Sequence, residues 1–149
     1  MLDLKDVLKG RIVIVCLGNI DRGDDGIGPR LAAIIKGKSV HEVIDAGVAP
    51  ENHTGIIIRF KPDTIIMVDA VDFDGRAGEA RLFSSGELRS GKISTHDVSP
   101  KLLIEYLKSY VDAEIYLLGI KPVSNKFGEG LSKEAERALR DLEHMFLAK

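Results

Sequence analysis

Short segments with a strong apolar or β-branched character recur along this chain, separated by stretches with helical spacing. Runs of five or six such residues are typical of buried strands. Strands are predicted over residues 12–17, 40–44, 64–68, 79–83 and 114–118. Between these strands and after the last one, apolar residues recur every three or four positions. This spacing predicts helices over residues 29–35, 50–58, 100–111 and 131–146, with Ser132 as N-cap of the last.

Alternation of strands and helices predicts a three-layer α/β/α domain around a five-stranded, mainly parallel sheet. The fourth strand is the exception. The segment between Asp69 and Glu79 is short and rich in Gly and Asp, so it cannot hold a crossover helix of ordinary length. We therefore expect strand four to run antiparallel at an edge of the sheet. A length of 149 residues fits a single domain, residues 1–149.

Carboxylates follow each of the first three predicted strands. The first strand leads into a glycine-rich loop, residues 18–28, that contains Asp24 and Asp25 before a predicted helix. Asp24 is predicted to cap that helix, which leaves Asp25 available for chemistry. Asp45 and Asp69 end the next two strands. Because parallel strands carry ligands beyond their carboxyl ends, all three loops are expected at one solvent-facing rim.

Other polar residues and glycines of these loops are expected to shape a cleft there: Gly18, Asn19, Asp24, Asp45, Gly47 and Asn52. For Asp45, a role as the acid of a strand-end turn is an equal alternative.

One histidine stands out from the other three. His96 lies in a polar loop just before a predicted helix, whereas His41, His53 and His144 are expected in structural or surface positions. Two carboxylates and one imidazole suit nickel, zinc or manganese with coordination positions left open. Without a metal, Asp25 and Asp69 could instead share a proton as an acid–base pair. Spacing alone leaves both alternatives open.

Charge and cysteine content exclude several classes of protein. The net charge is −2 and no Lys/Arg cluster occurs, which argues against nucleic-acid or membrane-surface binding. The single cysteine, Cys16, lies in the first apolar run and is expected in the core. No leader peptide and no run long enough to span a bilayer is recognised, so we expect a cytoplasmic protein. A monomer is the expected state.

Five blocks of sequence follow one another in a characteristic order. They are residues 18–29, 44–52, 68–70, 93–96 and 118–122. Together they resemble the hydrogenase maturation endopeptidases, and the second block resembles the formate-hydrogenlyase-type branch of that family. The resemblance covers nearly the whole chain. Ala46, where many relatives have glycine, departs from the pattern, and this bears on the local turn.

The resemblance implies an endopeptidase, often grouped with the aspartic-type (aspartyl) proteases. Such an enzyme removes the C-terminal extension of a nickel–iron hydrogenase large-subunit precursor after nickel has been inserted. The implied catalytic and metal-contacting residues are Asp25, Asp69 and His96. The nickel is implied to belong to the substrate and to serve as a recognition mark, and another divalent ion could substitute for it. The fold of the family also implies an antiparallel fourth strand.

Two other functions compete with this one. A phospho-acceptor receiver domain would use an acidic pair, an aspartate after strand three and a lysine after strand five, which Asp24-Asp25, Asp69 and Lys121-Pro122 can supply. However, receivers place the acidic pair at the strand end, whereas several loop residues intervene here. A nucleotide-binding module is disfavoured because neither a Gly-x-Gly-x-x-Gly fingerprint nor a phosphate-cradling Lys-Ser/Thr is present.

Overall fold

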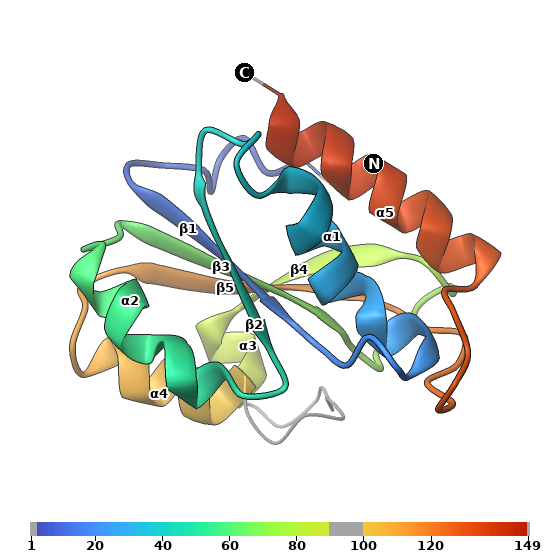
Figure 1. The fold of residues 1–149 in the computed structure, drawn as a ribbon. Coiled ribbons are helices and arrows are strands. Elements are labelled where there is room, and N and C mark those ends of the chain that lie inside the picture. The colour runs from blue at the N-terminus through green and yellow to red at the C-terminus, as the bar shows by residue number, and fades with distance from the viewer. Residues whose placement is uncertain (1–2, 90–99, 149) are drawn as a thin grey trace.

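A five-stranded sheet lies between two layers of helices in the computed structural model, which describes residues 3–89 and 100–148 (Figure 1). The strands are β1 (Ile12–Leu17), β2 (Glu42–Gly47), β3 (Thr64–Ala70), β4 (Ala80–Ser84) and β5 (Glu114–Ile120). The α-helices are α1 (Ile27–Ile35), α2 (Thr54–Arg59), α3 (Ser85–Arg89), α4 (Pro100–Lys108) and α5 (Lys133–Leu147). Two 3₁₀ turns, η1 (Gly23–Gly26) and η2 (Pro50–His53), precede α1 and α2.

The sheet topology confirms the predicted fold class. The strand order is β2-β1-β3-β5-β4. The first four of these strands are mutually parallel, and β4 runs antiparallel to β5 at the edge. The link from β3 to β4 is too short to return the chain to the opposite end of the sheet, so β4 runs in the reverse direction.

Each face of the sheet packs against its own helices. Alternate residues of β1 divide between two cores: Ile14 and Cys16 join the core covered by α1 and α5, while Val13 and Val15 join the core beneath α2 and α4. Figure 1 shows α1 and α5 on one side of the sheet and α2, α3 and α4 on the other. This double covering explains why β1 and β3 are apolar at nearly every position.

Several predicted boundaries were wrong. Strands β2, β3 and β5 continue to Gly47, Ala70 and Ile120, beyond their predicted ends, because ladder pairing with neighbouring strands continues there. Asp45 and Asp69 therefore lie inside strands and not after them. Strand β2 begins two residues later than predicted and β4 one residue later.

The helices also differ from their predicted limits. The predicted helix over residues 50–58 is divided into η2 and α2, and α4 ends at Lys108 and not at residue 111. Helix α1 begins at Ile27, two residues before the predicted start, and α3 was not predicted. The prediction of Ser132 as N-cap of α5 is confirmed, since its Oγ accepts a hydrogen bond from the Ala135 amide at 3.1 Å.

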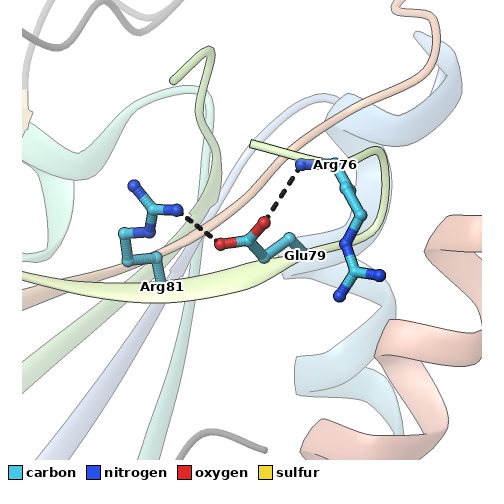
Figure 2. Close-up of polar contacts among 3 residues, drawn as sticks. All are labelled: Arg76, Glu79 and Arg81. Atoms are coloured by element: carbon cyan, nitrogen blue, oxygen red, sulfur yellow. Dashed lines mark hydrogen bonds and ion pairs between the residues drawn. The ribbon is translucent and has the colours of Figure 1, made fainter. Parts of the chain in front are cut away.

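The turn before β4 is held by a carboxylate. Glu79 accepts hydrogen bonds from the Arg76 amide at 3.0 Å and from the Arg81 guanidinium at 2.6 Å (Figure 2). The Arg76 hydrogen bond, followed by that of Arg81, lowers the pKa of Glu79. Backbone bonds join this turn to Lys121 just after β5, so the turn and the end of β5 are linked. None of the helices in the described residues is of a length and apolarity that could cross a membrane.

Candidate functional site

The loop after β1 packs tightly against the end of its own strand. Gly18 has φ +134°, and a Cβ there would lie 1.9 Å from the Asp25 carbonyl oxygen. Gly28, in the first turn of α1, would bring a Cβ within 2.0 Å of the Leu17 carbonyl oxygen. Only glycine allows these approaches. The two glycines thus keep η1, which carries Asp25, directly over the carboxyl end of β1.

Asp25 is held by the backbone of this loop. Its amide donates to the Arg22 carbonyl oxygen at 3.0 Å, and its Oδ2 accepts from the Asn19 amide at 3.0 Å. The Asn19 side chain in turn accepts from the Asp21 amide at 2.9 Å. Asn19 therefore acts on Asp25 through its main chain, while its side chain shapes the turn.

Asp69 is the next-to-last residue of β3 and lies opposite Gly119 of β5. Its Oδ1 accepts from the Ala70 amide at 2.8 Å. Asp69 is 0% exposed and Asp25 is 4% exposed, so both carboxylates are buried, in contrast to the expected solvent-facing rim. The strands are longer than predicted, and the loop folds back over their ends.

The topology brings Asp25 and Asp69 to the same end of the sheet, where the parallel strands have their carboxyl ends. Strands β1 and β3 are parallel neighbours, and η1 contacts β3. The chain leaves β1 toward β2 on one side and passes from β3 toward β5 and β4 on the other. This is a topological switch point, the position at which open α/β sheets bind ligands.

The third residue of the predicted constellation, His96, lies outside the described residues. Within residues 3–89 and 100–148, no three His, Cys, Asp or Glu side chains are grouped so as to hold a metal ion. Assignment of Asp25, Asp69 and His96 as a joint site therefore remains a prediction. The described part of the structure contributes the two carboxylates.

The prediction that Asp24 caps the following helix was wrong. The N-cap position of α1 is Gly26, and no side chain caps it. The 3₁₀ turn η1 intervenes between Asp24 and α1. Asp24 is 2% exposed, and it accepts hydrogen bonds from the Val123 amide (2.8 Å), the Ser132 amide (2.7 Å) and the Ser132 hydroxyl (2.8 Å).

Of the other predicted cleft residues, Gly47 lies beside the end of β1, and Asp45 and Asn52 are exposed on the surface. Gly47 ends β2 with φ +53°, and its carbonyl oxygen accepts from the Gly18 amide at 3.0 Å, which joins the ends of β2 and β1. Asp45 is exposed within β2, so its alternative role in a strand-end turn was wrong. Asn52 is exposed in η2. Their participation in a cleft is still a prediction.

Burial shifts the pKa of two further groups. Cys16 is fully buried, as predicted, and burial together with the nearby charge of Asp45 raises its pKa to about 12. His41 is half-buried just before β2, and burial lowers its pKa. His144 is exposed in the last turn of α5, in agreement with its predicted surface position.

Two polar links near the site were not predicted. Lys121, just after β5, forms an ion pair with Asp72, just after β3. Asp24 and Ser132, 108 positions apart, form the hydrogen bonds given above. No local sequence pattern predicts either pair, because the partners become neighbours only when β1, β3 and β5 align in the sheet.

The chain is similar in sequence to a known protein family. Residues 27–149 match the model of the HycI family, described as hydrogenase maturation protease. The hydrogenase 3 maturation protease of Escherichia coli K12 is 38% identical over 115 residues, which cover 74% of this chain and 72% of that protein.

Solved structures give the same result. The crystal structure of a [NiFe] hydrogenase maturation protease, HycI, from Thermococcus kodakarensis KOD1 matches with a TM-score of 0.83 and 32% identity. The match covers 97% of this chain and 96% of that one. The solution structure of the endopeptidase HycI from Escherichia coli matches with a TM-score of 0.79 and 28% identity, over 93% and 90% of the two chains. The receiver and nucleotide-binding alternatives gain no support from these matches.

Proposed function

Because this chain belongs to the hydrogenase maturation protease family, whose members are endopeptidases, we propose that it processes a nickel–iron hydrogenase large-subunit precursor. In this proposal it removes the C-terminal extension of the precursor after nickel has been inserted. The proposed setting is the cytoplasm, and the proposed working form is a monomer.

The observation that carries this proposal is the pair of buried carboxylates, Asp25 and Asp69, at the switch point of the sheet. Polar groups are seldom buried without a purpose, because burial costs a carboxylate its hydration. Carboxylates suit a divalent ion of intermediate hardness, and an imidazole from His96 would complete the proposed set. The two described residues therefore fit the family's implied chemistry.

The nickel is proposed to arrive with the substrate. Two carboxylates and one imidazole, with no thiolate, form a weak site for a free divalent ion. The same groups would add useful coordination to a metal that the precursor already holds with open positions. Recognition would then require both halves of the site, and another divalent ion of similar preference could substitute.

Asp25 and Asp69 also supply proton acceptors for the hydrolytic step. A carboxylate beside the scissile bond can take a proton from the attacking water. In this proposal the same pair would give the enzyme the character of an aspartic-type protease.

The test is a cleavage assay on paired precursors that differ only in nickel content. The wild-type protein is expected to cleave the nickel-loaded precursor and to leave the nickel-free precursor intact, with products identified by mass spectrometry. Asp25→Asn is expected to lower cleavage at least about 100-fold, because it removes a proposed metal-contacting carboxylate.

A fold control accompanies the assay: the circular dichroism spectrum of Asp25→Asn should match that of the wild type. Equal cleavage of both precursors would refute nickel gating and leave the endopeptidase assignment in place. Cleavage of neither precursor would refute the proposed substrate.

A further inference from the structure

We propose that Asp24 is a positioning residue for Asp25, and that it acts by fastening the loop of Asp25 to the start of α5. This inference rests on the proposed function, because it gives Asp25 a role in the reaction. Asp24 is itself directed away from the carboxylate pair, toward the segment of residues 123–132.

The two adjacent aspartates make different contacts. Within η1, successive side chains of a 3₁₀ turn point about 120° apart. Asp25 is directed back to the Asn19 amide of its own loop. Asp24 accepts from Val123 and Ser132 in the segment before α5. The same 3₁₀ turn therefore places the Asp25 carboxylate at the candidate site and the Asp24 carboxylate against the segment before α5.

The anchor continues into a long helix. The Ser132 hydroxyl donates to Asp24 Oδ2 at 2.8 Å, while its oxygen accepts from the Ala135 amide at 3.1 Å. Ser132 is the N-cap of α5, which buries Ala135, Ala138, Leu142 and Phe146 against the core. Asp24 is thereby connected to an element whose position is set by packing.

Backbone bonds reinforce the same junction. The Asp24 amide donates to the Ser124 carbonyl oxygen at 2.8 Å, and the Gly23 amide donates to that of Glu129 at 3.0 Å. Gly128 donates in return to Asp21 at 2.7 Å. At Gly23, φ is +51° and a Cβ would lie 2.6 Å from the Ser124 oxygen, so the two loops touch along their main chains.

A single 3₁₀ turn does not hold its shape without such contacts, since nucleating a turn is unfavourable and short helices are marginal alone. The place of the Asp25 carboxylate thus depends on the Asp24 anchor. Reactions that depend on orientation lose about 100-fold for a displacement near 1 Å. Asp24→Asn would turn an amide NH₂ toward N–H or O–H donors and so weaken the anchor while preserving size.

The experiment measures kcat and KM for cleavage of the nickel-loaded precursor at 25 °C, together with Tm, for wild type, Asp24→Asn and Leu142→Ala. Leu142 is fully buried in α5, ten residues after Ser132, so its truncation lowers stability without removing a hydrogen bond of the anchor. We expect Asp24→Asn to lower kcat about tenfold or more with KM within about threefold. Leu142→Ala should keep kcat within about twofold, provided that both variants are fully folded at the assay temperature.

A second pair of variants leaves Asp24 in place. Ser132→Ala removes the donor to Asp24 and the cap of α5, whereas Ser132→Thr retains a hydroxyl for both. The expected result is a loss of kcat in Ser132→Ala and near wild-type kcat in Ser132→Thr. Ser132→Asp keeps a cap acceptor but sets a second carboxylate against Asp24, so it should lose kcat as Ser132→Ala does.

Asp25→Asn separates the two proposals. If Asp25→Asn is inactive while Asp24→Asn loses no more kcat than Leu142→Ala, the positioning role is refuted and the proposed function stands. If Asp25→Asn cleaves as well as wild type, Asp25 has no role in the reaction and both proposals fall. A matching loss of kcat in Asp24→Asn, Ser132→Ala and Ser132→Asp supports the positioning role.

Discussion

Burial controls the chemistry of individual side chains close to the candidate site. Asp25 and Asp69 were expected at a solvent-facing rim, yet both are almost completely removed from solvent. Their replacement by Asn is consequently a change inside the protein. For Asp25→Asn the amide oxygen can still accept from Asn19, so a loss of about 1 kcal/mol in stability is the expected scale.

Cys16 yields a testable consequence of burial. Its raised pKa, about 12, keeps the thiol protonated in the folded protein at pH 8. We expect a maleimide reagent to modify native protein at least about 100-fold more slowly than protein in 6 M guanidinium, where the thiol titrates normally, as liquid chromatography with mass spectrometry would record.

The variant Asp45→Asn serves as its control. Burial is the larger cause of the raised pKa and Asp45 the smaller, so this variant should remain slow to react. Rapid labelling of the native wild type would contradict the buried position. Because the folded pKa lies above the unfolded one, the Cys16 contribution to stability is present below pH 9 and is lost as the pH rises toward 12.

At the scale of elements, close approach of helix to strand explains a glycine that helical propensity would disfavour. Gly28 in α1 would place a Cβ 2.0 Å from the Leu17 oxygen, whereas Gly55 in α2 has no atom within 4 Å of the same position. We expect Gly28→Ala to lower the free energy of unfolding by about 1–3 kcal/mol, because α1 must move away from β1.

Gly55→Ala is the matched control and should have the opposite sign. Alanine raises helical propensity, so a gain of about 0.5–1 kcal/mol is expected in urea unfolding. Stabilisation by both changes would show that α1 does not press on the end of β1. A difference in sign between two Gly→Ala changes in helices isolates that contact from propensity.

At the scale of the whole molecule, the strand order predicts which backbone amides require the largest free energy of opening before they exchange with solvent. Strands β1, β3 and β5 each pair on both sides, whereas β2 and β4 lie at the edges. Amides of Ile66, Met67 and Leu117 are fully buried in central strands. We expect them to exchange only through global unfolding, with apparent opening free energies equal to the value from urea unfolding.

Edge amides in β4 should exchange through smaller openings, and their rates should depend less on urea. Hydrogen exchange followed by NMR at increasing urea concentration measures both. Faster exchange in β3 than in β4 would contradict the central place of β3 in the sheet.

All five strands and the fold class could be predicted from the amino-acid pattern, whereas helix α3 and several boundaries could not. Apolar runs of strand length predicted β1, β3 and β5, with burial on both faces expected for β3. The short link after Asp69 predicted the antiparallel β4. These conclusions are local, since they depend on periodicity and on the reach of a short segment. The glycine-rich loop that carries Asp25, and Asp69 near the end of β3, could likewise be selected as candidate site residues from the local sequence.

The contacts of each carboxylate and the end of each strand depend on the folded arrangement of the chain. Strand ends depend on pairing with neighbours, which carried β3 past Asp69 to Ala70. Asp24 looked like the cap of its own helix, but it binds Ser132, a residue distant in sequence. Such long-range contacts depend on the alignment of β1 with β5 across β3, and no pattern within either segment encodes that alignment because it exists only in the folded chain.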